Sequence, residues 1–160
     1  MDPLLERVAQ IRPKLLLDVG CAWGTCTKKL AEYCGEIIAV DLSLAVLERA
    51  ERENGAANIK YLSASALQLP FADGQFDTVI ERGSLHHVRE WQVMLSEMVR
   101  VASGRVLALE PIDDVRNPGK RAAVAAHHLF LELQAEVGYA HYEHLTEFDV
   151  RSWCTEHGLE

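Results

Sequence analysis

Short apolar runs that alternate with amphipathic stretches constrain the fold of the first 111 residues more than any other feature. The expected strands are Leu15–Val19, Ile37–Val40, Ile59–Leu62, Phe76–Ile80 and Val106–Leu109. The stretches between them, at about residues 25–34, 43–54 and 91–101, carry apolar residues at helical spacing. This alternation is typical of a parallel sheet with helices on both faces. We therefore expect an α/β fold: a doubly wound, Rossmann-like, mainly parallel sheet in three layers.

Length and charge limit the class of protein. A chain of 160 residues is enough for one domain and too short for two of ordinary size. No apolar run approaches the roughly 20 residues that span a bilayer, and residues 1–6 do not resemble a secretory signal, so we expect a cytoplasmic protein without membrane contact. The net charge of −8 repels phosphate backbones. A small neutral or cationic partner is therefore expected, rather than nucleic acid.

The cysteines and histidines do not predict a metal site. The cysteines are Cys21, Cys26, Cys34 and Cys154. Because none of them forms a CxxC pair, we interpret them as reduced thiols. His127, His128, His141 and His144 are close in sequence, but no carboxylate completes a convincing ligand set.

The loop after the first strand has the features of a ligand site. Small residues at Gly20, Ala22 and Gly24 allow the backbone to turn tightly and approach a ligand. The helix that follows directs backbone N–H groups toward an anionic group. Asp18, at the end of the strand, would repel a pyrophosphate but suits an ammonium or sulfonium centre. The GxGxxG fingerprint is absent, because Ala22 and Thr25 occupy two of its glycine positions, which disfavours a dinucleotide oxidoreductase.

The next two strands also end in candidate binding residues. Asp41 follows the second strand directly, where a carboxylate can accept hydrogen bonds from the two hydroxyls of a ribose. Alternatively, it is an acid at the start of a helix, near Ser43, stabilised by the helix dipole. Its pairing with Asp18 favours the ribose interpretation. The loop at residues 63–71 could frame a flat heterocycle, or it is a plain surface loop.

The fourth strand brings polar side chains to the same end of the sheet. Glu81 and Arg82 end this run, and His86 and His87 follow shortly after. A histidine at such a position can act as an acid, as a base or in orienting a substrate. A structural role is the competing interpretation.

Five segments together resemble the class I S-adenosylmethionine-dependent methyltransferases, in particular the small-molecule type that includes quinone-biosynthesis enzymes. The resemblance covers about residues 14–111 and rests on LLLDVGCAWG, VDLS, LPFADGQFDTVI, SLHHV and LSEMVRV…GRVLALEP. It implies that S-adenosylmethionine lies across the strand ends and leaves as S-adenosylhomocysteine. The expected cofactor-binding residues are Asp18, Gly20, Cys21, Ala22, Gly24, Asp41, Leu42, Ser65, Ala66, Leu67 and Glu81. Where an acceptor must lose a proton, His86 or His87 is the expected base.

The chain departs from the family pattern at several positions. Ala22 replaces the usual middle glycine, and Ser65 replaces an aspartate that accepts from the adenine amino group. Loss of that charge-assisted bond is expected to lower affinity. These departures keep open a non-catalytic S-adenosylmethionine-binding module or partner subunit as the alternative function.

The resemblance also implies a domain organisation. We expect a single domain over residues 1–160, with a cofactor-binding core at 14–111 and a helical acceptor-side or lid segment at 112–160. The family usually continues through two further strands, and without the last one or two Val106–Leu109 would be an exposed edge. We therefore expect a truncated chain, or an edge covered by another copy of the protein or by residues 120–157.

Overall fold

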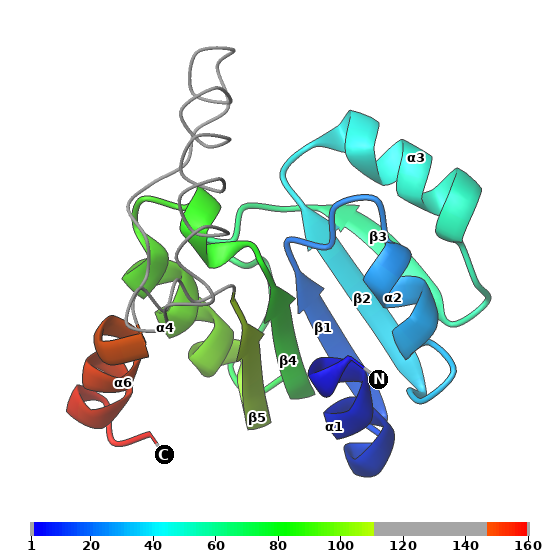
Figure 1. Cartoon of the computed structure of the whole chain (residues 1–160). Coiled ribbons are helices and arrows are strands. Elements are labelled where there is room, and N and C mark those ends of the chain that lie inside the picture. The colour runs from blue at the N-terminus through cyan, green and yellow to red at the C-terminus, as the bar shows by residue number, and fades with distance from the viewer. Residues whose placement is uncertain (1, 111–146, 160) are drawn as a thin grey trace, which may run out of the picture.

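The computed structural model describes residues 2–110 and 147–159, and Figure 1 shows their arrangement. The strands of its sheet are β1 (Leu15–Val19), β2 (Glu36–Asp41), β3 (Ile59–Ser63), β4 (Phe76–Arg82) and β5 (Ala102–Leu109). Their order is β3-β2-β1-β4-β5, and every neighbouring pair is parallel. The strand order reverses between β1 and β4, so the carboxyl ends of these two strands mark the place where ligands bind in such sheets.

Helices cover both faces of the sheet, which gives the expected three layers. One face carries α1 (Pro3–Ile11), α2 (Thr25–Leu30) and α3 (Leu44–Asn54). The other carries α4 (Trp91–Val101), α6 (Glu147–Glu156) and the short 3₁₀ helix η1 (Leu85–His87). Neighbouring residues of β1 serve opposite cores: Leu16 packs with the α1–α3 side and Leu17 with the α4 side. The doubly wound α/β fold is confirmed.

Helix α1 is an element that the sequence analysis did not predict. Asp2 caps it, since its Oδ1 accepts from the backbone N–H groups of Leu4 and Leu5. Pro3 occupies the first helical position, where its missing N–H has no intrahelical partner to lose. Both signals are visible in the sequence, but the helix lies before the first strand and outside the alternating pattern.

Strand β5 begins earlier than expected. The strand expected at Val106–Leu109 starts at Ala102, so Ser103 and Gly104, which have the composition of a turn, lie within β5. The register of the pairing shifts here: Phe76 of β4 pairs with Ala102 and Thr78 pairs with Arg105, so β5 has one more residue than β4 between the two pairs. The two residues therefore belong to a β-bulge. Gly104 fits because a Cβ atom there would come within 2.5 Å of the carbonyl oxygen of Asp77.

Strand β5 is at the edge of the sheet among the described residues, with β4 as its neighbour. Trp153 of α6 is buried in the same apolar cluster against which Val106 packs. Part of the segment expected to cover this region therefore does contribute to the core beside β5. Covering of the edge by another copy of the protein stays a prediction. Most of the helical segment expected at residues 112–160 falls outside the described residues, as does the division between this segment and the expected core.

No helix among the described residues is long and apolar enough to cross a membrane.

Candidate functional site

A cavity of about 620 Å³ opens at the carboxyl ends of β1, β2, β3 and β4. Its walls are formed by Val19, Gly20, Ala22, Val40, Asp41, Leu42, Ala64, Ser65, Ala66, Leu67, Arg82, Gly83, Ser84, His87, Val88, Arg89, Glu90 and Met94. The volume lies within the roughly 300–1,000 Å³ typical of small-molecule sites. Because the cavity spans the reversal of strand order, its position and size both favour a small organic ligand.

The loop between β1 and α2 has a left-handed backbone at three positions. Gly20 has φ +75°, Ala22 φ +47° and Gly24 φ +72°. A Cβ atom on Gly20 would come within 2.6 Å of the Cβ of Ser84, so no larger residue fits beside the β4 loop. Ala22 adopts its conformation although left-handed backbone is unfavourable for alanine. Ala22 lies on the cavity wall, at the position where the resemblance described above leads us to expect glycine.

Asp41 connects this loop to the start of α3. Its Oδ2 accepts from the backbone N–H of Ala22 at 3.0 Å, and its Oδ1 accepts from that of Ser43 at 3.0 Å. Ser43 also caps α3 by accepting from Val46. A carboxylate has about four acceptor positions, so both oxygens keep capacity for hydroxyl groups of a ligand. Asp41 therefore has the structural position of a helix-start acid and also lies on the cavity wall.

The loop after β3 forms the opposite wall. It turns through Ser65, whose Oγ accepts from the backbone N–H of Leu67 at 3.2 Å. Ala64, Ala66 and Leu67 add apolar surface to the cavity. This combination of small apolar residues with one hydroxyl could border a flat heterocycle.

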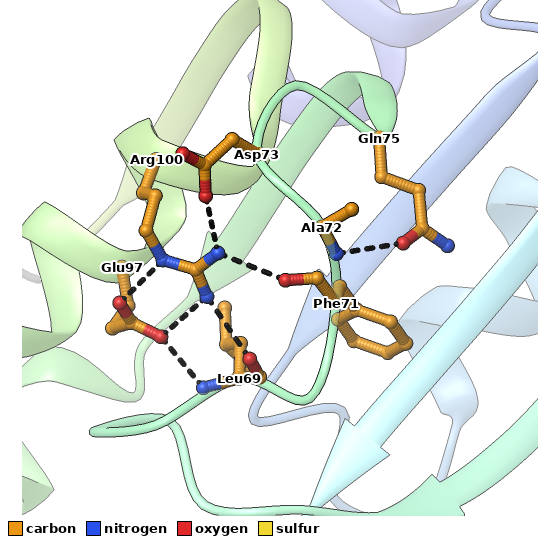
Figure 2. Close-up of polar contacts among 7 residues, drawn as sticks. All are labelled: Leu69, Phe71, Ala72, Asp73, Gln75, Glu97 and Arg100. Carbon is orange, nitrogen blue, oxygen red and sulfur yellow. Dashed lines mark hydrogen bonds and ion pairs between the residues drawn. The ribbon is translucent and has the colours of Figure 1, made fainter.

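Arg100 of α4 fastens the continuation of this loop, as Figure 2 shows. Its guanidinium donates to the carbonyl oxygens of Leu69 and Phe71 and to the carboxylates of Asp73 and Glu97. Glu97 in turn accepts from the backbone N–H of Leu69 at 2.7 Å, and its hydrogen bond with Arg100 lowers its pKa. The sequence analysis missed this pair; its only local signal is an acid and an arginine three residues apart on a helix.

The two histidines occupy different positions. His87 lines the cavity, whereas His86 does not. The Nδ1 of His86 lies 2.6 Å from Oε2 of Glu110, just after β5. The two histidine rings are 4.2 Å apart between centroids and tilted by 44°. His87 is therefore the histidine placed to meet a ligand. Glu110 is part of the GRVLALEP segment, but the sequence analysis did not give it a role in the site.

Two acids lie buried directly behind the cavity wall. Asp18 accepts from the hydroxyl of Thr27 at 2.6 Å, and burial together with the charge of Asp41 raises its pKa to about 6. Glu81 accepts from the backbone N–H of Ser84 at 3.0 Å. Burial, followed by the nearby charge of Glu110, raises the pKa of Glu81 well above its ordinary value. Buried carboxyls with perturbed pKa values are frequent close to functional sites.

The structure brings most, but not all, of the expected site residues to the cavity wall. Those that line it are Gly20, Ala22, Asp41, Leu42, Ser65, Ala66, Leu67 and His87. Those that do not are Asp18, Cys21, Gly24, Glu81 and His86. Their expected roles in binding or catalysis stay predictions. Among residues 2–110 and 147–159, no three His, Cys, Asp or Glu side chains are grouped to hold a metal ion. His127, His128, His141 and His144 lie outside the described residues.

Comparison with known proteins identifies the family. Residues 17–108 match the family described as a methyltransferase domain. A demethylmenaquinone methyltransferase of Bacillus velezensis is 38% identical over an alignment of 102 positions that covers 59% of this chain and 44% of that protein. An uncharacterized methyltransferase of Mycobacterium tuberculosis is 31% identical over 97 residues, or 61% of this chain and 49% of that protein. The chain thus spans about half the length of these relatives.

Solved structures agree with this match. A candidate methyltransferase from Bacillus halodurans superimposes with a TM-score of 0.76 at 25% identity, covering 96% of this chain and 68% of that one. A SAM-dependent methyltransferase from Aquifex aeolicus has the same fold, with a TM-score of 0.69 at 18% identity over 96% of this chain and 78% of that one. The sheet order, the family match and these structures lead to one assignment. The chain belongs to the class I S-adenosylmethionine-dependent methyltransferases.

Proposed function

We propose that this chain binds S-adenosylmethionine in the cavity and transfers its methyl group to a small-molecule acceptor. The observation that carries the proposal is the position of Asp41, a carboxylate on the wall of a cavity at the reversal of strand order. Its two oxygens already hold the adjoining loops and retain acceptor capacity for a ribose. The net charge of −8 favours a neutral or cationic acceptor over a nucleic acid.

The cavity wall fits the parts of this cofactor. Asp41 would accept from the ribose hydroxyls, and Leu42, Ala66 and Leu67 would flank the adenine. The Ser65 hydroxyl would accept from the adenine amino group. The backbone of the loop at residues 20–24 would lie against the methionine part, with the buried acids Asp18 and Glu81 behind it. In a low-dielectric setting, the ionised form of an acid favours a cationic ligand; Asp18, with a pKa of about 6, has this form at neutral pH, whereas the raised pKa of Glu81 favours its neutral form.

The chemistry needs little from the protein beyond alignment. When bound, S-adenosylmethionine supplies a methyl group that is already activated by its sulfonium charge. The wall must place the acceptor atom in line with the methyl carbon and exclude water. A hydroxyl or amine acceptor loses a proton as its new bond to carbon forms and the bond from carbon to sulfur breaks. His87, on the cavity wall, is the residue placed to take that proton.

Calorimetric titration with S-adenosylhomocysteine tests the binding site. We expect Asp41→Asn to weaken binding by about tenfold to 100-fold, because charge-assisted hydrogen bonds give way to weaker neutral ones and 1.4 kcal/mol corresponds to tenfold. Asp77→Asn is a matched control. The carboxylate of Asp77 also accepts from two backbone N–H groups, those of Lys14 and Leu15, but it does not line the cavity. It should leave the dissociation constant within about twofold.

The outcomes distinguish the proposal from its alternatives. Equal weakening by both substitutions would show that stability, not the cavity carboxylate, controls binding. If the protein binds the cofactor, a screen with methyl-labelled S-adenosylmethionine against phenols, quinols and amines tests transfer. Binding without transfer to any acceptor would favour the non-catalytic binding module.

A further inference from the structure

Glu110 clamps the short helix that carries the two histidines. It follows β5, whose parallel pairing with β4 brings it beside the loop that leaves β4. Its Oε1 accepts from the backbone N–H of Leu85 at 2.7 Å, and its Oε2 lies 2.6 Å from Nδ1 of His86. Both side chains are largely shielded from solvent, at 8% exposure for Glu110 and 18% for His86. One carboxylate therefore fixes both the backbone of η1 and the ring of its central residue.

The bond with Glu110 selects one form of the imidazole. Burial opposes ionisation of Glu110, but the hydrogen bond with His86 and the neighbouring Glu81 carboxyl outweigh it and lower the pKa of Glu110. An ionised carboxylate can only accept, so Nδ1 of His86 must carry the proton. A second partner that fixes the tautomer and orientation of a histidine is a recurrent feature of functional sites.

Glu81 supports this clamp from β4. Its side chain is completely buried, and its Oε2 accepts from the backbone N–H and hydroxyl of Ser84, at 3.0 and 2.9 Å. Its Oε1 has no hydrogen-bond donor among the described residues, and the charge of Glu110 acts on this carboxyl. Two acids so close together do not both ionise readily. A proton on Glu81 would satisfy the unpaired oxygen by donation to Glu110.

We propose that Glu110 is a positioning residue for the acceptor side of the cavity. Backed by Glu81, it holds η1 in place and keeps His86 in the form with a proton on Nδ1. His86 lies against the ring of His87, which lines the cavity. The link to methyl transfer through His87 rests on the proposed function, but the clamp itself exists without any ligand.

Nuclear magnetic resonance of the full chain, labelled with ¹⁵N-histidine, tests the clamp directly. Long-range proton–nitrogen spectra distinguish the two tautomers, and His86→Gln identifies the signals of His86. We expect the wild type to show Nδ1 protonated. We expect Glu110→Ala to shift His86 toward a mixture or the other tautomer. Glu110→Gln, whose amide oxygen can still accept, should restore much of the wild-type pattern.

Glu97→Ala provides a matched control. Glu97 likewise accepts from one backbone N–H, that of Leu69, and pairs with one side chain, that of Arg100. These contacts hold the loop after β3 and do not involve η1. Glu97→Ala should leave the signals of His86 unchanged. A wild type with Nδ1 unprotonated would overturn the proposal, as would a His86 signal insensitive to Glu110→Ala in a protein still folded by circular dichroism. If Glu110→Ala does not fold, a Glu110→Gln pattern with Nδ1 unprotonated overturns it equally.

Binding of S-adenosylhomocysteine separates this proposal from the proposed function. Glu110 does not line the cavity, so Glu110→Gln should change the dissociation constant by less than about threefold. Failure of the wild type to bind would overturn the proposed function. The tautomer of His86, measured without ligand, would still decide the role of Glu110.

Discussion

Replacement of Gly20 by alanine should destabilise the fold by roughly 1–5 kcal/mol, a range that follows from three effects. The left-handed backbone at φ +75° disfavours alanine by about 1–2 kcal/mol. The new Cβ would lie 2.6 Å from the Cβ of Ser84, and such overpacking costs about 1–3 kcal/mol. Alanine also lowers the conformational entropy of the unfolded chain relative to glycine, which offsets about 0.4–1 kcal/mol of the destabilisation.

A double-mutant cycle isolates the steric part of this loss. Ser84→Gly removes both atoms that the new methyl group would meet, the Cβ at 2.6 Å and the Oγ at 2.8 Å, whereas Ser84→Ala removes only the Oγ and keeps the closer Cβ. Both substitutions remove the hydroxyl that donates to Glu81, so they are matched in that respect. Unfolding in urea, followed by tryptophan fluorescence, gives the free energy of each variant. We expect a coupling of about 1–3 kcal/mol between Gly20→Ala and Ser84→Gly, and a smaller coupling with Ser84→Ala, which leaves the contact between the two Cβ atoms.

Two results would refute the reasoning. If Gly20→Ala changed the free energy of unfolding by less than about 0.5 kcal/mol, the left-handed backbone and the close contact would both be in doubt. If Ser84→Ala relieved the loss as well as Ser84→Gly did, the contact between the two Cβ atoms would not be its cause.

Two further predictions concern groups behind the cavity. Burial and the neighbouring charge of Glu110 raise the pKa of Glu81 in the fold above its unfolded value, so its contribution to stability is fully present below the unfolded pKa and is lost as the pH rises through the folded pKa. Glu81→Gln should reduce this fall in the free energy of unfolding with rising pH, which is at most about 1.4 kcal/mol per pH unit for one proton. Substitution of the exposed Glu36 by Gln should leave the fall unchanged. Urea unfolding measured over a series of pH values gives these slopes, and equal slopes for the wild type and Glu81→Gln would contradict the assignment. Arg100→Gln should speed amide hydrogen exchange at Leu69, because Glu97 loses the guanidinium that orients it; unchanged exchange would show that Arg100 is not needed to hold the loop.

The central elements of the fold were predictable from local patterns. The bounds of Leu15–Val19, the helix after Ser43 and the helix at residues 91–101 agree with the structure, because apolar periodicity and capping residues are local signals. The start of β5 was wrong, since Ser103–Gly104 has the composition of a turn and only its pairing with β4 makes it a bulge. Helix α2 ends at Leu30, earlier than expected, because the next residues turn toward β2.

The position of an expected site residue on the cavity wall was predictable where its place in a loop determines that position. Asp41 and the residues around Ala22 and Ser65 reach the cavity because parallel strands end together. The sequence does not show which way a side chain at a strand end will turn. Asp18 turns to Thr27 beneath the loop, and Glu110 was missed because its partners are 24 and 25 residues away in the chain.

Acids of this site accept hydrogen bonds from backbone N–H groups of loops, which explains why they lie at one end of the sheet. Parallel strands end in loops whose backbone N–H groups have left the ladder and need other acceptors. Here side-chain carboxylates supply them: Asp41 accepts from two loops, Glu81 and Glu110 accept from the turn after β4, and Glu97 accepts from the loop after β3. Each such bond fixes a stretch of cavity wall by a side chain anchored on a strand or helix. The carboxyl groups that shape the cavity wall thus include Asp41, the proposed ligand contact, so substitution of any of them should be tested for fold and ligand together.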